Sequence, residues 1–159
     1  HIPDFPRDLA NRMDAMGMGV LVGWGPLRAA GPNAPASLGP PYRMLMNHSI
    51  HKGYHSDGGD VTLINPWLNF YTMTTGKNLA GQQILGDQVL TRQETLWLAT
   101  AANKWFIEED DLGSIEVGNR GDVCVLDRDC FTVNEEDFKR TKSALTIVSG
   151  KIMHNEGVA

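Results

Sequence analysis

The sequence predicts an α/β fold followed by a shorter all-β segment, and three observations support this prediction. A helical pattern leads directly into the apolar stretch Val20–Val22, which lacks the polar alternation of a half-exposed strand. A second strand pattern, at residues 53–60, ends in a glycine-rich turn with polar side chains. After the acidic run at 108–111, strand and turn patterns replace the helical ones. We therefore place a boundary near residue 108.

A helix is expected at the start of the chain. Leu9, Met13 and Met16 recur at three- and four-residue spacing, which predicts a helix over residues 1–16. Gly17 follows, and glycine commonly ends helices. A short helix that leads into a buried strand is typical of α/β proteins.

The segment 23–41 is predicted to be a long loop, because it is rich in glycine and proline. Loops of this length in compact domains are usually functional or disordered. Trp24 favours an ordered loop that faces a ligand. A surface tryptophan that covers one end of the fold is an equally good interpretation.

Residues 41–75 alternate between helix and strand patterns. Residues 41–50 are expected to be helical, and the strand at 53–60 follows them. An Asn-Pro pair at 65–66 is typical of a helix start, so a helix is predicted over 65–75. Ligands bind at the carboxyl ends of parallel strands in barrels and doubly wound sheets, which draws attention to the end of the 53–60 strand.

The clearest helix signal lies at Thr91. Thr91 and Glu94 have the spacing of a capping box, in which hydroxyl and carboxylate each accept a hydrogen bond from a backbone N–H. The pattern predicts a helix that continues to residue 105. It contains an apolar stripe at helical spacing, formed by Leu98, Ala101, Ala102 and Trp105.

Strands and turns are predicted after residue 108. Residues 112–117 and 122–127 read as strands on either side of a turn at 118–121. The acidic residues 135–137 belong to a helix or a loop. Two short strands about a Ser-Gly turn at 149–150 form the last predicted element.

Composition narrows the class of protein. The chain has 159 residues, of which 42% are hydrophobic and 21% charged, as in globular proteins. No apolar run approaches the roughly 18–20 residues that span a bilayer. The net charge of −5 disfavours a nucleic-acid surface, and two cysteines, Cys124 and Cys130, disfavour a disulfide scaffold. We therefore expect neither a membrane nor a nucleic-acid partner.

Two further expectations concern the context of the chain. No signal-peptide pattern is visible, so we expect a cytoplasmic location. The chain starts at His1 instead of a methionine and enters patterned sequence at once, so we expect it to be a piece of a longer protein. This second expectation conflicts with the single domain that the length alone predicts.

Three histidines and a carboxylate are candidates for metal chemistry. His48, His51 and His55 precede Asp57, and imidazole and carboxylate are common zinc ligands. Their spacing matches no zinc-finger or metalloprotease motif, which favours packing or surface roles for two of the histidines. Asp57 is the more specific candidate for a functional residue, because the two glycines after it let a ligand approach closely. It could bind a metal or act as a base, and a turn role explains its position equally well.

Other polar residues favour structural roles. Asp122 and Asp127 flank an apolar strand and are expected to be solvated strand ends. Cys124 is expected to be a core or an outward-facing thiol, and its distance from Cys130 does not match a CxxC motif. The segment 118–122 contains neither a P-loop nor a GxGxxG pattern, so nucleotide binding has no support.

Several stretches of the chain share one resemblance. An alanine- and threonine-rich helix at Glu94–Asn103 precedes the Gly-Ser-Ile-Glu-Val-Gly and Gly-Asp-Val patterns within Leu112–Asp127. A Ser-Asp pair at 56–57 stands before the Asn-Pro helix start at 65–66, and Val-Ser-Gly-Lys-Ile occupies 148–152. Together they resemble the C-terminal end of the amidohydrolase superfamily. The acidic insert that follows the second stretch is most similar to amidohydrolase family 3, which includes formamide and N-acyl amino acid hydrolases.

The sequence departs from the family pattern at three positions. Asn119 stands where lysine is usual and Gly121 where alanine is usual, and neither change touches the chemistry. His55 stands where a glycine commonly precedes the Ser-Asp pair, so it lies beside the expected metal position.

The resemblance implies a fold and a set of site residues. Residues 1–108 are expected to form the C-terminal part of a (β/α)8 TIM barrel, and 109–159 strands of a small all-β sandwich. Family members use one or two divalent metal ions, commonly zinc, to activate a water. Asp57 corresponds to the last-strand aspartate that binds metal and moves the proton from water to the leaving amine. His1 corresponds to a metal-binding histidine of an earlier strand, and Trp24 and His55 are expected substrate contacts.

The function implied by the resemblance is metal-dependent hydrolysis of a C–N bond in a small-molecule amide, formamide or cyclic amide. The HxH pair and the bridging lysine of the family do not occur in this sequence, so the chain alone is expected to be inactive. Open sheet edges of a partial barrel also favour a homo-oligomer. The alternative is a non-catalytic α/β binding module or a degenerate barrel fragment.

Overall fold

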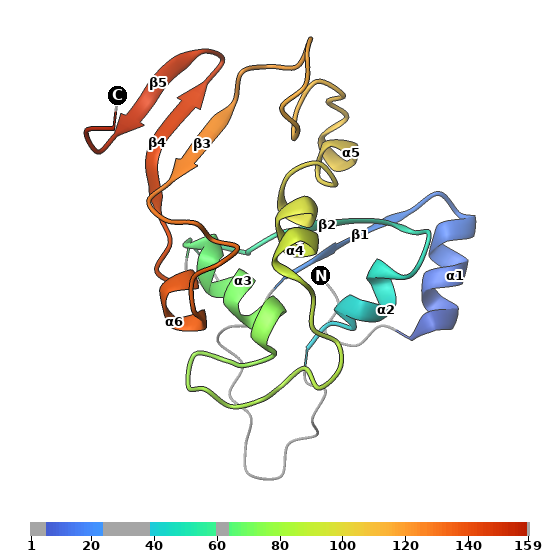
Figure 1. Ribbon diagram of the computed structural model, residues 1–159. Coiled ribbons are helices and arrows are strands. Elements are labelled where there is room, and N and C mark those ends of the chain that lie inside the picture. Colours follow the sequence, from blue (N-terminus) through green and yellow to red (C-terminus); the bar gives the residue numbers. More distant parts are fainter. Residues whose placement is uncertain (1–5, 24–38, 60–63, 159) are drawn as a thin grey trace.

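Figure 1 shows the computed structural model of the chain, which describes residues 6–23, 39–59 and 64–158. Among these residues, β1 (Gly19–Val22) and β2 (His51–Tyr54) form a parallel pair, and three later strands form an antiparallel sheet. Helices gather around the parallel pair, and the antiparallel sheet extends away from them toward the C-terminus (Figure 1). The predicted mixed α/β class is therefore confirmed.

The first helix, α1 (Arg7–Ala15), ends where the sequence predicts. Gly17 adopts φ +69°, a left-handed conformation that glycine reaches without steric cost. Its N–H donates to the carbonyl of Asp14 at 2.9 Å. The N–H of Met18 donates to the carbonyl of Met13 at 3.0 Å, which completes a Schellman motif.

The parallel pair is buried on one face. Val20 and Val22 are 5% and 3% exposed, which confirms the buried strand predicted from their apolar run. The register places Val22 opposite Tyr54. The pairing continues one residue further, because the N–H of His55 donates to the Val22 carbonyl at 3.1 Å. The polar segment after β2 therefore starts from a fixed backbone position.

The helix α2 (Tyr42–Met46) is shorter than the one predicted over 41–50. Nδ1 of His48 accepts a hydrogen bond from the N–H of Ile50 at 3.0 Å, and Nε2 lies 2.8 Å from Asn11 Oδ1. A side chain that binds the backbone two residues further on competes with helical hydrogen bonds. The helix therefore ends early, and the chain turns into β2.

The helix α3 (Pro66–Thr75) confirms the prediction for this segment. Asn65 Oδ1 accepts a hydrogen bond from the N–H of Trp67 at 3.0 Å, and Gly76, at φ +75°, ends the helix. Trp67 and Phe70 are buried, and their ring centroids lie 5.3 Å apart. α3 thus supplies an aromatic part of the core.

The helix α4 (Arg92–Ala99) starts with the predicted capping box. The N–H of Glu94 donates to Thr91 Oγ1 at 3.1 Å, and the N–H of Thr91 donates to the Glu94 carboxylate at 2.7 Å. Arg43 of α2 donates two further hydrogen bonds to this carboxylate, at 2.6 and 2.7 Å. The guanidinium lowers the pKa of Glu94 to about 2. One carboxylate thus caps α4 and ties it to α2.

The prediction of one helix through residue 105 is wrong beyond Ala99. Thr100 has φ −121° and ψ −93°, outside the helical region, and α5 (Lys104–Ile107) follows as a separate short helix. Trp105 is 41% exposed instead of continuing the buried stripe. The interruption coincides with Asn103, whose side chain binds the backbone of β2.

Residues 112–117, predicted as a strand, form turns instead. Gly113 adopts φ +84°, which an extended strand does not allow. Nδ2 of Asn119 donates to Ser114 Oγ at 2.8 Å, so side-chain contacts hold the segment. Ile115 is 88% exposed, so the apolar alternation in this segment does not mark a buried face.

The antiparallel sheet contains β3 (Val123–Leu126), β4 (Ser143–Val148) and β5 (Lys151–Asn155), in that order. β4 and β5 form the predicted hairpin. Ser149 and Gly150, at the turn, adopt φ +49° and +77°, the left-handed pair that a tight hairpin turn favours. The turn prediction is therefore confirmed.

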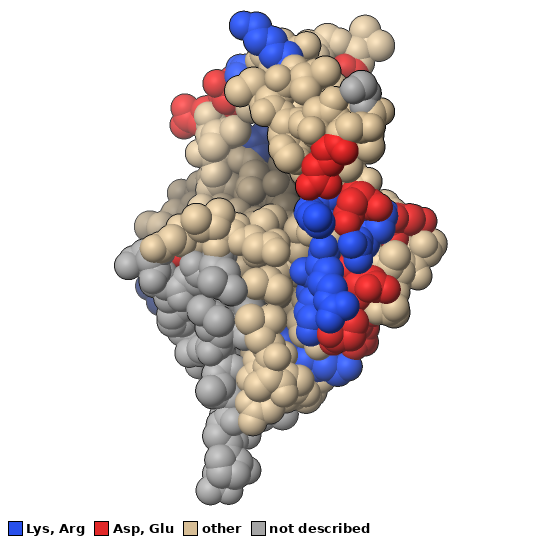
Figure 2. All heavy atoms as spheres, turned by 90° about the vertical axis from the view of Figure 1, so that its left-hand side faces the viewer, with Lys and Arg blue, Asp and Glu red and all other residues tan. Residues whose placement is uncertain are grey.

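A short helix, α6 (Glu135–Phe138), ties this sheet to the helical part of the molecule. The buried Phe138 ring lies 5.5 Å from that of Trp67 on α3, and the Arg92 guanidinium lies 4.5 Å from its centre. On this side of the molecule, Figure 2 shows Lys and Arg interleaved with Asp and Glu in one band. Ion pairs on and around α6 are Lys77–Glu135, Arg128–Asp137 and Lys139–Glu136.

The two sheets lie on either side of the predicted boundary near residue 108. The division into 1–108 and 109–159 stays a prediction, because α6 of the second segment packs against α3 of the first. Within the described ranges, no helix is long and apolar enough to cross a membrane.

Replacing Glu94 by Gln is expected to lower the free energy of unfolding by about 1–2 kcal/mol, the usual contribution of such a cap and charged hydrogen bond. The pKa of Glu94 is lowered from 4.5 to about 2. Its stabilisation is therefore fully present above pH 4.5 and is lost as the pH falls toward 2. Urea unfolding at neutral and acidic pH measures both effects.

The matched control is Glu116→Gln, because the structure gives this exposed carboxylate no ion pair within the described residues. We expect its effect to stay within about 0.5 kcal/mol at either pH. Equal losses in the two variants, or a Glu94→Gln loss that persists unchanged at low pH, would contradict the assignment.

Candidate functional site

The carboxyl end of β2 carries the candidate site. His55, Ser56, Asp57 and Gly58 follow the last strand residue directly. The N–H of Gly58 donates to Ser56 Oγ at 3.0 Å, which closes a turn immediately after the strand. Side chains at this end of a parallel pair share one edge, and this edge is where α/β sheets bind ligands.

The structure brings two predicted site residues together in this turn. Nδ1 of His55 lies 3.1 Å from Asp57 Oδ1, and the two side chains are 17% and 26% exposed. A carboxylate only accepts hydrogen bonds, so Nδ1–H is the donor. Asp57 adopts φ +50°, a left-handed conformation that costs most residues roughly 1–2 kcal/mol. The result is a largely buried carboxylate with a defined orientation.

Gly23, the residue directly after β1, leaves space for the backbone at the carboxyl end of β2. A Cβ on Gly23 would lie 1.7 Å from the carbonyl oxygen of His55, a distance that no real contact allows. The hydroxyl of Tyr42 donates to the Gly23 carbonyl at 3.2 Å and holds the chain in this position. Gly23, the first residue of the predicted loop, is therefore required by a close backbone approach.

Asn103, which is not among the site residues predicted from the sequence, holds the other edge of β2. Its Oδ1 accepts a hydrogen bond from the N–H of Tyr54 at 2.9 Å, and its Nδ2 donates to the Tyr54 carbonyl at 3.0 Å. Since the N–H of His55 points to β1, these two groups of Tyr54 face away from it. One side-chain amide thus takes the place of a neighbouring strand. No local sequence pattern signals this role of Asn103.

The three histidines singled out in the sequence do not converge. His48 contacts Asn11 of α1, and the His51 ring stacks on Trp105 with centroids 4.2 Å apart. His55 alone lies beside the carboxylate. Within residues 6–23, 39–59 and 64–158, no group of three or more metal-ligating side chains occurs. His48 and His51 therefore have the packing and surface roles of the alternative interpretation.

A buried polar pair lies behind the strand end. Both amide atoms of Asn69, which is 1% exposed, and the hydroxyl of Tyr54 have no well-formed hydrogen bond among the described residues. Burial raises the pKa of Tyr54 to about 12, and the nearby Asn69 and Ser56 offset only part of this. Leaving a buried polar group unpaired costs about 1–3 kcal/mol. The polar groups at this strand end thus lower the free energy of unfolding.

Asp57 is suited to one ligand position of a metal site. Carboxylate oxygens bind divalent ions well, and ligating carboxylates are commonly held by a hydrogen bond from a neighbouring side chain, as His55 provides. The described residues do not complete a ligand set around it. The second predicted ligand, His1, and the predicted substrate contact Trp24 lie outside the described residues.

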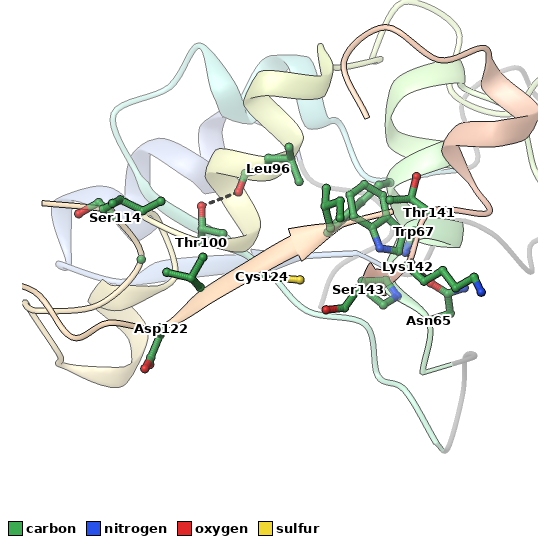
Figure 3. Close-up of a pocket in the computed structure, with 16 residues that line it drawn as sticks. Asn65, Trp67, Leu96, Thr100, Ser114, Asp122, Cys124, Thr141, Lys142 and Ser143 are labelled. Atoms are coloured by element: carbon green, nitrogen blue, oxygen red, sulfur yellow. Dashed lines mark hydrogen bonds between the residues drawn. The ribbon is translucent and has the colours of Figure 1, made fainter. Parts of the chain in front are cut away.

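A groove of about 770 Å³ lies between α3, α4 and β3, away from this turn. In Figure 3, Ser114 lies at one end of the groove and Asn65 and Lys142 at the other, with Leu96 of α4 on the side of the helices. Its lining is mainly apolar. No lining residue belongs to the 51–58 segment, so the groove is separate from the candidate site.

The fold and the strand end define a class of protein, namely a mixed α/β protein that presents a carboxylate and a histidine at the carboxyl end of a parallel strand. The chain belongs to the amidohydrolase family, because the family 3 model matches residues 8–154. The resemblance identified from the sequence is thereby confirmed. No curated protein matches the chain in sequence.

Solved structures of hydrolases share the fold. Atrazine chlorohydrolase TrzN from Arthrobacter aurescens TC1, complexed with zinc, is 19% identical with a TM-score of 0.63, over 100% of this chain and 37% of that one. A triazine hydrolase variant is 20% identical with a TM-score of 0.63, over 100% and 36%. Identity this low shows the fold alone. The chain spans about a third of the length of these structures.

Replacing Gly23 by Ala is expected to lower the free energy of unfolding by about 1–3 kcal/mol, because the new methyl group would collide with the His55 carbonyl and force the backbone apart. Thermal or urea unfolding measures the loss. Gly121→Ala is the matched control, since its Cβ would meet its nearest neighbour, Gly150 N, at 3.7 Å. Similar stability of the two variants would show that Gly23 and His55 are not in close contact.

Replacing Tyr54 by Phe is expected not to lower stability, because the removed hydroxyl has no well-formed hydrogen bond in the described structure. Tyr42→Phe is the control, since the Tyr42 hydroxyl donates to the Gly23 carbonyl. Its loss should cost about 1 kcal/mol. Equal losses in the two variants would mean that the Tyr54 hydroxyl has a hydrogen-bond partner after all.

Proposed function

We propose that this chain supplies part of the active site of a metal-dependent hydrolase that breaks C–N bonds in small molecules. The observation that carries the proposal is Asp57, which stands at the carboxyl end of β2 in a left-handed turn and is held by His55. Membership of the amidohydrolase family supports this assignment. The similarity of the fold to structures of named hydrolases agrees with it.

The proposed cofactor is a divalent metal ion, with zinc as the first candidate and one or two ions in the complete enzyme. Zinc is favoured because the similar TrzN structure is complexed with it. Asp57 is the proposed ligand from the strand end, and His1 is a second, by the family resemblance. When bound, such an ion would lower the pKa of a water molecule and polarise the bond to be broken.

Asp57 is also the proposed carrier of the proton. As a carboxylate it would accept a proton from the attacking water, and it would then donate this proton to the leaving nitrogen. Trp24, from the loop predicted over 23–41, is a proposed substrate contact, and His55 lies at the carboxyl end of β2.

The proposed substrates are small molecules with an electrophilic carbon bonded to nitrogen: an amide, a formamide or a cyclic amide. The similar structures bear the names triazine hydrolase and atrazine chlorohydrolase. Nitrogen heterocycles therefore belong among the compounds to be tested. In all of them, attack by water on the carbon displaces a leaving group that requires a proton or a stabilised charge.

The architecture proposed for the complete enzyme is a (β/α)8 TIM barrel with a small β-sandwich. Residues 1–108 would contribute the last barrel units and 109–159 the sandwich strands. The parallel pairing of β1 and β2, with helices around the pair, supports this proposal. Active sites of such barrels lie at the carboxyl ends of the strands, where the turn after β2 is found.

Replacing Asp57 by Asn in the complete enzyme is expected to lower kcat/KM by roughly 10²–10⁴-fold, the usual contribution of a general acid–base group. The amide cannot carry the proton and is a weaker metal ligand, so the bound metal should also decrease. Hydrolysis of a panel of amides and nitrogen heterocycles, together with elemental analysis of the purified protein, measures both quantities.

Asp110→Asn is the matched control, because Asp110 is an exposed carboxylate on the segment after α5. It should leave both the activity and the metal content unchanged. An Asp57→Asn enzyme that remains fully active would contradict the proposal. A protein that binds these compounds without metal and without turnover would favour the binding-module alternative.

A further inference from the structure

The turn after β2 contains more hydrogen bonds than a simple chain reversal needs. The backbone N–H of His55 is bound to the Val22 carbonyl at 3.1 Å, and the N–H of Gly58 is bound to Ser56 Oγ at 3.0 Å. These two contacts determine where the backbone of the turn runs. Neither of them determines how the Asp57 carboxylate is oriented within it.

Among the described residues, a contact to the carboxylate comes from the His55 ring. Nδ1 of His55 lies 3.1 Å from Asp57 Oδ1, and both side chains are mostly shielded from solvent. The hydrogen bond spans Ser56 and joins residues i and i+2. The hydrogen bond shows that Asp57, at φ +50°, directs its carboxylate toward the His55 ring.

The His55 ring is itself held in place. Its backbone is part of the ladder to β1, and Gly23 lies so close that an added Cβ would stand 3.7 Å from ring atom Cδ2. A ring whose backbone and one side are restricted presents Nδ1 in a reproducible direction. The hydrogen bond to Asp57 is therefore made without a large loss of side-chain freedom.

The geometry points to His55 as a positioning residue, which holds the Asp57 carboxylate through Nδ1–H···Oδ1 in the orientation that metal binding and proton transfer require. This inference rests on the function proposed for Asp57. It gives His55 a role through Asp57 instead of a direct contact with substrate. A histidine also explains the departure from glycine at this position, since glycine offers no donor to the carboxylate.

The test uses three variants of the complete enzyme. His55→Asn keeps an N–H donor near the position of Nδ1, His55→Gln moves the donor further out, and His55→Leu removes it. We expect the His55→Leu and His55→Gln variants to bind zinc more weakly and to show a kcat that is about 10–100-fold lower, with little change in KM. This is the usual effect of losing such a supporting contact. His55→Asn should restore most of both quantities.

Two readouts do not depend on turnover. Zinc affinity is measured by competition with a chromophoric chelator. In ¹⁵N-histidine NMR spectra of the metal-free protein, His55 should show the Nδ1–H tautomer, and Asp57→Asn should change its signal. His154→Leu, at an exposed histidine on β5, is the control that should leave every quantity unchanged.

The outcomes separate this inference from the proposed function. If the Leu variant raises KM while kcat and zinc affinity stay constant, His55 is a substrate contact and the positioning role is wrong. If all three variants lose activity equally and melt at lower temperature, the role is structural and the inference is also wrong. If Asp57→Asn itself keeps full activity and zinc, the proposed function fails whatever the His55 variants do.

Discussion

The candidate site depends on the parallel pairing of β1 and β2 and above all on its last hydrogen bond, from the N–H of His55 to the carbonyl of Val22. This bond extends the ladder one residue past the strand, so the turn begins from a fixed point. The His55 side chain then reaches Asp57 across Ser56. Without that last pairing, the carboxylate would sit on an unsupported loop. The pairing of the two strands thus determines the geometry of the site.

β2 is held on both edges, by β1 on one side and by the Asn103 side chain on the other. α5 lies against the same strands, because a Cβ on Gly19 would stand 2.6 Å from the Trp105 ring and one on Gly53 would stand 2.9 Å from the Phe106 ring. In the barrel that we propose, a further strand would lie along the edge of β2 that faces away from β1, beside Asn103.

Features with local causes could be predicted from the sequence, whereas features with distant causes could not. The helix start at 65–66, the capping box at Thr91 and the hairpin turn at 149–150 each follow from residues within one turn of one another. Asn103 and Tyr54 are 49 residues apart, and no local pattern joins them. Asp57 could be identified from its place at a strand end. The hydrogen bond that orients it required the left-handed turn to be known.

Features that lower the stability of the fold gather at the carboxyl end of β2. Three non-glycine residues have positive φ among those described. Glu108 follows α5 as its C-cap and Ser149 lies in the hairpin turn, so both have structural explanations. Asp57 also lies in a turn, and the residues around this turn include Tyr54 and Asn69, whose buried polar atoms lack well-formed hydrogen bonds in the described structure. Strain and unpaired polar groups persist where the surrounding structure imposes them, most often at functional sites. Independently of the family resemblance, the physical chemistry of the chain therefore favours this edge as the functional one.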